Sequence, residues 1–434
     1  MATTAYGLTN YSNALRQVIQ PYIQNNVPKQ VKLLQTLKTN DNVQRFNNNF
    51  FVAIRSNRHG GVTNLANDKS KLNTGSSPIV QGTVSPRIMT ATFDISDQLM
   101  KASANDKLAV ESAMTFQMQA LTDDFSKSAN RQFFSDGAGV IAMITESGGS
   151  VGAGTAQIQY PNNNMTTEGR AAPYYGTGAG GINGDLRPQK YFTDGQIIGI
   201  GSAGTAVGTI ATSGVTGVGG GISGTAALGT LVFTATTPFP ASAPLYILDG
   251  DADASGTTEI QGIRAALSEG TGNYIGLGRS LDVMNPQIMG TAQNQSLTIN
   301  NMESIYLAAY EYSREGDRYA WFGNRTVVQK FGDLLTALRR TVNKVELVSG
   351  WGGLDFQLSG NPVPVIMDYD CADGEMVLLN LDTWTVCEIA PMGFIDDPLL
   401  RRVDFTTFQK VFTWYANLIC RAPAANGRMV RQTR

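Results

Sequence analysis

The feature that most constrains the fold of this chain is a long polar excursion between two apolar segments. Residues 57–85 consist mostly of Asn, Gly, Thr, Ser, Lys and Pro, with too few apolar side chains to pack a core of their own. The apolar runs at 50–54 and 88–95 predict strands on either side, so the segment is interpreted as a projecting hairpin. Such a hairpin needs support from another body, most simply a neighbouring copy of the same chain.

A long amphipathic helix is predicted directly after the second of these strands. Ser103 or Asn105 is expected to cap its start, and Asp136-Gly137 is expected to end it. At about 1.5 Å per residue its length is on the order of 45 Å, which is typical of a strut; a core helix of an ordinary large domain is the alternative. The apolar stripe recurs every three or four residues and comprises Met114, Met118, Leu121, Phe125, Ala129 and Phe133.

The composition excludes several classes of protein. With 434 residues and 42% hydrophobic content, the chain is long enough for two or three cores and is not a disordered protein. Charged residues make up 16%, against about 25% in typical soluble domains, which favours β structure, loops and subunit-covered surface. The net charge of −2 indicates no general preference for nucleic acid or anionic lipid.

Positive charge is nevertheless concentrated near the start of the chain, where Asp41 is the single acidic residue of positions 1–50. A solvated charged terminus is the commoner meaning of such a pattern, and a basic arm that faces a packaged polyanion is the functional candidate. The candidate residues are Arg16, Lys29, Lys32 and Lys38.

The cysteines and the chain start indicate a cytosolic setting. Cys371, Cys387 and Cys420 lie far apart and lack metal-ligand spacing, which fits a reduced compartment. The first ten residues contain neither a basic segment nor an apolar run, and no stretch approaches ~18 uninterrupted apolar residues. We therefore expect neither a signal peptide nor membrane insertion.

The rest of the chain predicts an α+β fold. Residues 195–248 contain no charged residue, and their alternation of apolar and small polar side chains predicts short strands in a β insertion; disorder is the alternative. Helices are then predicted at 301–314 and 325–340. Strands are predicted at 364–367, 376–379 and 383–389 and within 403–420, without the repeated units of a doubly wound sheet.

Two motifs that imitate ligand sites fail on their context. Residues 199–204 match a dinucleotide fingerprint, but 205–216 is not a helical sequence and no acidic residue follows at the required spacing. Asp251 and Asp253 begin a calcium loop, but Gly262 stands where a bidentate Glu is required and Glu259 is out of place. We predict no cofactor and no metal.

No catalytic constellation is evident either. His59 is the only histidine and has no nucleophile motif near it, so we predict that it is exposed and not catalytic. Pairs of carboxylates adjoin basic residues, a pattern that suits salt bridges between subunits at least as well as acid-base chemistry. The candidate salt-bridge residues are Asp396, Asp397, Arg401 and Arg402. The chain is not predicted to be an enzyme, and an undetected hydrolase is a poorer alternative.

The order of these elements resembles that of the major capsid proteins of tailed bacteriophages, which have the Hong Kong ninety-seven fold. Short sequence segments at 262–267, 274–280, 417–423 and 427–428 are also similar to that family. The resemblance covers essentially the whole chain and depends on the order and spacing of these segments. It implies an N-terminal arm at 1–48, an extended hairpin at 49–98, a peripheral domain with the spine helix at 99–150, a Gly/Thr-rich β insertion at 151–262, an axial domain at 263–395 and a C-terminal return at 396–434.

The resemblance also implies contacts and partners. The extended loop would lie on an adjacent subunit through Arg58, His59, Lys69, Lys71 and Arg87. Some members of the family join subunits by a Lys-Asn isopeptide bond, and Lys69 or Lys71 stands where such a lysine would be. A solvated or salt-bridged lysine is the favoured interpretation, and cross-linking is the alternative. The implied partners are other copies in pentamers and hexamers, portal, scaffolding and decoration proteins, and double-stranded DNA inside a virion assembled in the host cytoplasm. An encapsulin-like compartment and a β-rich tail-fibre or adhesin protein are the alternative functions.

Overall fold

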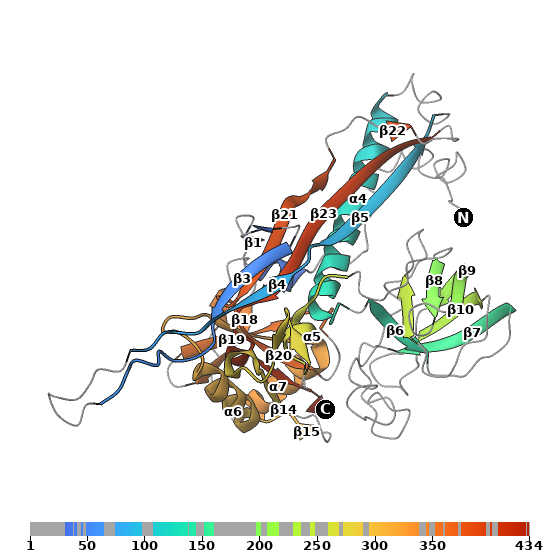
Figure 1. The fold of residues 1–434 in the computed structure, drawn as a ribbon. Helices are drawn as coiled ribbons and strands as arrows, with labels where there is room; N and C mark the ends of the chain where they lie inside the picture. The colour runs from blue at the N-terminus through green and yellow to red at the C-terminus, as the bar shows by residue number, and fades with distance from the viewer. Residues whose placement is uncertain are drawn as a thin grey trace.

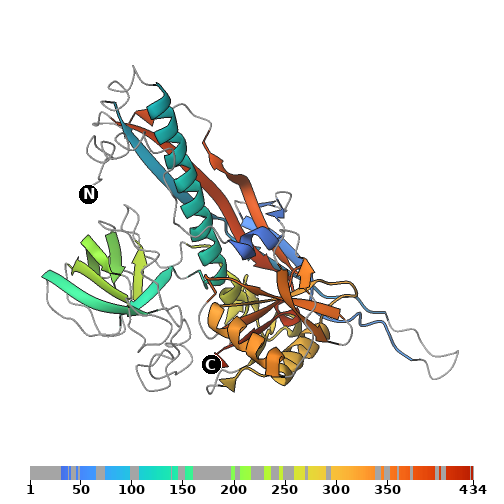
Figure 2. The same ribbon diagram turned by 180° about the vertical axis from the view of Figure 1, so that it is seen from behind.

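The computed structural model contains a long slab of helix and sheet, a helix-and-sheet domain at one end of it, a β-barrel and a projecting hairpin (Figures 1 and 2). It mixes helices and strands, as expected for an α+β chain. The structure describes residues 31–37, 39–40, 45–46, 49–64, 74–97, 107–137, 139–144, 152–159, 197–200, 206–216, 229–235, 244–247, 259–268, 272–289, 295–337, 344–346, 352–358, 361–371, 375–395, 400–401, 407–430 and 432–433.

The slab consists of the predicted long helix, α4 (Lys107–Phe134), lying along one face of a five-stranded sheet (Figure 2). Phe125 and Phe133 of the apolar stripe are buried against Phe412 and Trp414, with ring centroids 4.7 Å and 6.0 Å apart. The predicted start caps, Ser103 and Asn105, lie outside the described residues. The predicted end is confirmed, because α4 stops at Phe134 just before Asp136-Gly137, and Gly137 has φ +85°. The sheet contains β1 (Thr39–Asn40), β21 (Trp384–Phe394), β22 (Leu400–Arg401), β23 (Thr407–Cys420) and β5 (Arg87–Ser96).

The hairpin closes with a strand that the sequence did not reveal. β3 (Asn49–Arg55) pairs antiparallel with β4 (Ile79–Val84), whereas β5 pairs with β23 of the slab. The prediction that 88–95 closes the hairpin was therefore wrong. The apolar signal of β4 is diluted by Gly82, where a Cβ would lie 2.7 Å from Cδ1 of Ile275 and one of the two residues would have to shift.

A seven-stranded sheet with α6 (Ile299–Tyr310) and α7 (Arg325–Ala337) forms the domain at one end of the slab (Figure 1). Thr298 caps α6, since its hydroxyl oxygen accepts from the Asn301 amide at 3.2 Å. The predicted helices and strands of this region are confirmed, with shifted ends. In spatial order the strands are β14 (Gln287–Met289), β24 (Gly427–Met429), β20 (Met376–Asn380), β16 (Tyr319–Gly323), β19 (Asn361–Met367), β18 (Gly352–Leu358) and β17 (Lys344–Glu346).

The strands predicted in the uncharged tract form, and they belong to a closed barrel. Closure removes the free strand edges that charged side chains commonly protect, so a tract without charge is compatible with this architecture. Ile198 and Leu245 are fully buried. Around the barrel the strands are β10 (Gly229–Ala235), β7 (Gly152–Gln159), β6 (Val140–Ile144), β11 (Pro244–Ile247), β8 (Ile197–Ile200) and β9 (Ala206–Thr216).

A buried ion cluster joins α5 (Ile263–Ala266) to the seven-stranded sheet. Arg264 donates from Nε and Nη2 to Oε2 of Glu375, at 3.1 Å and 2.8 Å. Arg428 of β24 donates to Oε1 from Nε at 2.7 Å and also from Nη2, and its Nη1 donates to the Leu267 carbonyl. Burial raises the pKa of Glu375, but the two guanidiniums outweigh it and leave that pKa below its ordinary value.

Glu375→Gln is expected to lower the free energy of unfolding by about 3–5 kcal/mol, because it leaves two buried guanidiniums without their carboxylate. Urea unfolding followed by circular dichroism measures the change. Arg318→Gln is the control: the Arg318 side chain is 55% exposed and lies 3.4 Å from Asp382, so the loss should stay below about 1 kcal/mol. Equal losses in the two variants would contradict the prediction.

Candidate functional site

The candidate site is the hairpin that projects from the body of the molecule (Figure 1). At its root Phe50, Val52 and Val84 are buried, because alternate side chains of β3 and β4 face the core. Farther out the apolar side chains meet water: Ile79 is 69% exposed and Val62 is 85% exposed. A ribbon that carries exposed apolar groups beyond its own core is suited to contact another protein surface.

In its described part the two arms of the outer ribbon are joined by hydrogen bonds that end on backbone carbonyls, one of them from the Ser56 hydroxyl to the Pro78 carbonyl at 3.3 Å. The Ser56 amide donates to the Pro78 carbonyl at 3.1 Å, and the Gly60 amide donates to the Ser76 carbonyl at 3.3 Å. A Cβ at Gly75 would lie 2.1 Å from the Gly61 nitrogen, so the two arms approach more closely than any side chain permits. The ribbon is therefore narrow, and it has no core there.

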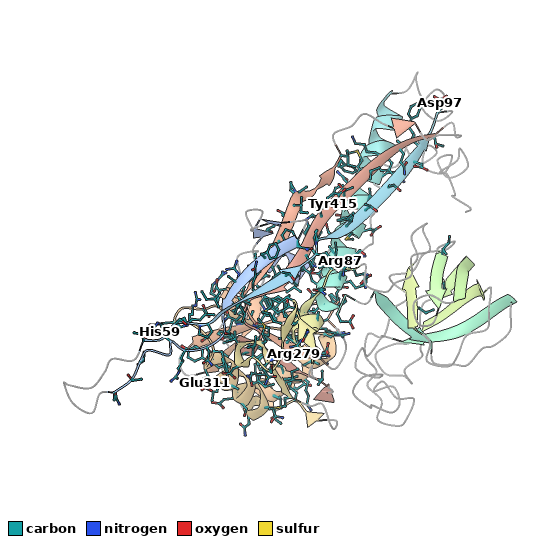
Figure 3. The ribbon with its side chains drawn as sticks, in the orientation of Figure 1. His59, Arg87, Asp97, Arg279, Glu311 and Tyr415 are labelled. Atoms are coloured by element: carbon teal, nitrogen blue, oxygen red, sulfur yellow. The ribbon has the colours of Figure 1, made fainter. Side chains whose placement is uncertain are left out.

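The predicted contact residues are distributed over the ribbon and the body. Arg58 and His59 are exposed on the ribbon, and Nδ1 of His59 accepts from the Gly61 amide at 3.1 Å (Figure 3). Arg87 begins β5 on the body and is half-buried, and its buried Nε has no hydrogen-bond partner among the described residues. Burial lowers the pKa of Arg87. Lys69 and Lys71 lie outside the described residues.

Of the predicted basic arm, the structure describes Lys32. Lys32 is 9% exposed, and burial lowers its pKa while the charge of Asp368 opposes that change. Its role in the basic arm stays a prediction. Arg401 lies in β22, and the structure describes its backbone but not its side chain. Arg16, Lys29, Lys38, Asp396, Asp397 and Arg402 lie outside the described residues, and their roles stay predictions.

Asn417 holds the root of the hairpin to the body. Its Nδ2 donates to the Ser85 carbonyl at 2.7 Å, while Oδ1 accepts from the amides of Gln261 and Leu418 at 3.0 Å and 2.9 Å. Asn417 is 1% exposed, so its own amide group cannot exchange these partners for water. The segment 417–423 was among those that resemble the capsid family, but the sequence indicated no role for Asn417 itself.

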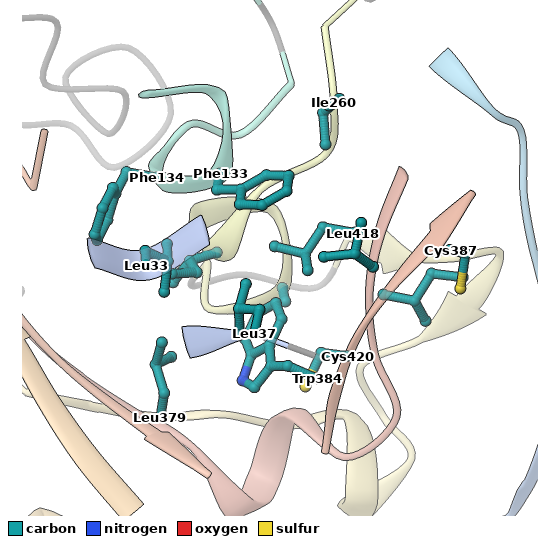
Figure 4. Packing of buried hydrophobic residues seen from close by; sticks show 14 of the residues in the cluster. Leu33, Leu37, Phe133, Phe134, Ile260, Leu379, Trp384, Cys387, Leu418 and Cys420 are labelled. Carbon is teal, nitrogen blue, oxygen red and sulfur yellow. The ribbon is translucent and has the colours of Figure 1, made fainter. Parts of the chain in front are cut away.

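The short helix α2 (Lys32–Thr36) docks on the slab through caps supplied by other segments. No side chain of its own caps its start. Instead the Leu33 amide donates to Oδ2 of Asp368 at 3.2 Å, and the Leu34 amide donates to Oδ1 of Asn130 at 3.1 Å. Nδ2 of Asn130 in turn donates to Asp368 and Asp370. Leu33 packs in the same apolar cluster as other buried side chains of the slab (Figure 4).

The sequence could not reveal this cluster, because its members come from three distant segments and match no local capping pattern. Burial, followed by the charge of Asp370, raises the pKa of Asp368 to about 6. The carboxylate of Asp368 is fully buried and accepts the α2 amide, which places the acid at the N-terminal end of a helix. The contacts that dock α2 therefore include one titratable group.

The described residues contain no group of three or more His, Cys, Asp or Glu that could hold a metal ion. The residues of the dinucleotide look-alike begin in β8, and β9 follows where a nucleotide site needs a helix. Glu259, the misplaced acid of the calcium look-alike, instead forms an ion pair with Arg131. No helix within the described parts of the chain is long and apolar enough to cross a membrane.

Comparison with solved structures identifies the fold. The chain matches a subunit in the capsid asymmetric unit of cyanophage A-1(L) over 95% of its own length and 96% of that chain, at 14% identity and a TM-score of 0.55. The chain has a phage capsid fold. No protein-family model and no curated protein sequence matches it.

Two further structures have lower scores. The capsid fold aligns with the capsid of the native GTA particle over 95% of this chain and 93% of that one, at 10% identity and a TM-score of 0.45. It aligns with the holo-SrpI encapsulin complex of Synechococcus elongatus over 97% and 95%, at 7% identity and a TM-score of 0.45. The expected capsid fold is confirmed, while the finer domain boundaries stay predictions.

The raised pKa of Asp368 predicts a specific pH dependence. A carboxyl whose pKa rises on folding stabilises the folded state below its unfolded pKa and loses that stabilisation as pH rises through about 6. As the Asp368 carboxyl ionises between pH 4 and 6.5, the free energy of unfolding of the unaltered chain should therefore fall by at most about 3 kcal/mol. In Asp368→Asn, urea unfolding should show no such fall, because the side chain cannot ionise. Parallel pH profiles for the two proteins would show that Asp368 does not titrate in this range.

Proposed function

We propose that this protein is the major capsid protein of a tailed phage, which assembles through copies of itself into pentamers and hexamers of an icosahedral shell around double-stranded DNA. The observation that carries the proposal is the hairpin. It leaves the body with Val62 and Ile79 largely exposed and with no core of its own in the described ribbon. The phage capsid fold supports the same conclusion, since it belongs to subunits that form shells.

The proposed mechanism is head-to-tail association of identical chains. The ribbon projects from one side of the body, so its partner surface lies on a different part of the next copy, and repetition of such a contact closes a ring. Each contact need only be modest in area, because the ribbon and the N-terminal arm make every subunit engage its neighbours at several places. The low charge content reduces the desolvation cost of covering the remaining surface.

The proposal also assigns the remaining partners. The basic residues near the chain start would face DNA non-specifically, without a sequence-reading element. Portal, scaffolding and decoration proteins are the expected companions of such a subunit in the virion. The protein would act through assembly and not as an enzyme.

The two exposed apolar side chains of the ribbon provide the test. Val62→Thr with Ile79→Thr should reduce the yield of closed shells at least tenfold, because the ribbon would no longer bury apolar area on a neighbour. The conservative control, Val62→Ile with Ile79→Val, should still form shells. Negative-stain images and sedimentation of full-length proteins measure the yield, and circular dichroism checks that both variants fold.

Closed shells of normal size from the threonine variant would overturn the role of the ribbon. A stable monomer of the unaltered chain at high concentration would overturn the proposed function itself. The contents of particles purified from cells separate the related possibility: DNA supports a phage head, whereas an enclosed enzyme would indicate an encapsulin-like compartment. An elongated trimer in light scattering would indicate a fibre protein.

A further inference from the structure

One residue beside the hairpin root has an unfavourable backbone conformation. Ile275 has φ +49°, in the left-handed region that β-branched residues rarely adopt. It forms a two-residue turn with Gly276, at φ +77°, between β12 (Asn273–Tyr274) and β13 (Leu277–Gly278). Such a turn normally has Asn, Asp or Gly at its first position, because these residues tolerate positive φ. Isoleucine is therefore an unusual residue at this position.

The hairpin holds Ile275 in this conformation. The Ile275 carbonyl accepts from the Thr83 amide of β4 at 3.0 Å. Its side chain is 5% exposed and lies over Gly82, where a Cβ would come within 2.7 Å of Cδ1 and 3.0 Å of Cγ1. The strained residue and the glycine therefore fit together as a matched pair, and any side chain at position 82 would displace one of them.

The other end of the turn is fixed to the body. The Tyr274 hydroxyl oxygen accepts from the Cys420 amide at the end of β23, at 2.9 Å. The Arg279 guanidinium lies 5.9 Å from the centroid of the Tyr274 ring, and it donates to the carbonyls of Ala265 and Ala266 in α5. Tyr274 is 3% exposed, so the turn has little freedom to move relative to β23 and α5.

We propose that Ile275 is a positioning residue that fixes the direction in which the hairpin leaves the body. The turn connects β4 to the rigid junction of β23 and α5 through one hydrogen bond and one close side-chain contact. A β-branched residue is useful here because its stiff side chain transmits the position of the turn to the ribbon. This inference rests on the proposed function for its consequence, since ribbon direction would set the angle between neighbouring copies.

The test measures ribbon direction within one copy. Cysteines introduced at the exposed positions Thr63, on the ribbon, and Ser304, on α6, carry spin labels, while the three native cysteines are buried. Labelled chain diluted into unlabelled chain reports only distances within one copy, whether or not the protein assembles. Ile275→Asn retains a residue tolerated in the left-handed region but removes the apolar contact. We expect the distance distribution to become at least twice as broad.

Amide exchange gives a second readout at the contact itself. The Thr83 amide should exchange at least tenfold faster in Ile275→Asn than in the unaltered chain. Gly82→Ala is the second variant and should shift the mean label distance, because the new Cβ displaces the Ile275 side chain. Val327→Ala is the control: Val327 is buried in the other apolar cluster, so the substitution lowers stability without reaching the hairpin.

A broadened distribution in Ile275→Asn and a shifted one in Gly82→Ala, with an unchanged one in Val327→Ala, supports the inference. Unchanged distributions in both hairpin variants overturn it, and so does equal broadening in the control, which would indicate a general loss of stability. Images of assembled shells test the proposed function and not the positioning role of Ile275. If the distributions change as expected but no variant or parent forms shells, the positioning role stands and the proposed function fails.

Discussion

The buried carboxylate of Glu375, held by Arg264 and Arg428, is the interaction on which the rest of the structure depends. Two guanidiniums and one carboxylate leave an excess positive charge in the interior, which is stable only while every donor has an acceptor. Those acceptors come from different segments, because Nη1 of Arg428 uses the Leu267 carbonyl. The cluster thus joins α5 and β24 to Glu375, the residue that precedes β20.

From this junction a series of buried polar contacts leads to the hairpin. Arg279 holds the end of α5 and packs beside Tyr274, whose hydroxyl binds the last amide of β23. Asn417, three residues earlier in β23, binds the Ser85 carbonyl at the hairpin root. Arg279, Tyr274 and Asn417 are buried, so losing one of these side chains removes contacts that water cannot readily replace. The hairpin root is consequently anchored at several points, although the described part of the ribbon beyond it has no core.

The sequence predicts what depends on periodicity and misses what depends on tertiary contact. The apolar stripe identifies α4, and its members Phe125, Ala129 and Phe133 are buried at the helical period. β4 escaped detection because Gly82 serves a close contact with Ile275, which no strand pattern encodes. The docking of α2 was equally hidden, because Asp368 and Asn130 cap it from distant segments. In the candidate site, His59 was correctly placed on an exposed ribbon, whereas the anchoring role of Asn417 could not be inferred.

An anchored root and a coreless ribbon together have a consequence for assembly in the proposed shell. Ordering a free ribbon costs conformational entropy of about 1–2 kcal/mol per residue, and its backbone hydrogen bonds alone offset little of that cost. If a neighbour supplies the missing apolar contact, the ribbon becomes ordered only on association. The entropy cost of that ordering is then subtracted from the free energy of the first contact, which is therefore weak. A root that already points the ribbon correctly reduces that cost for each later subunit. Weak first contacts combined with directed later ones favour completed rings over mixtures of partial ones, because an unfinished ring always leaves one ribbon uncovered.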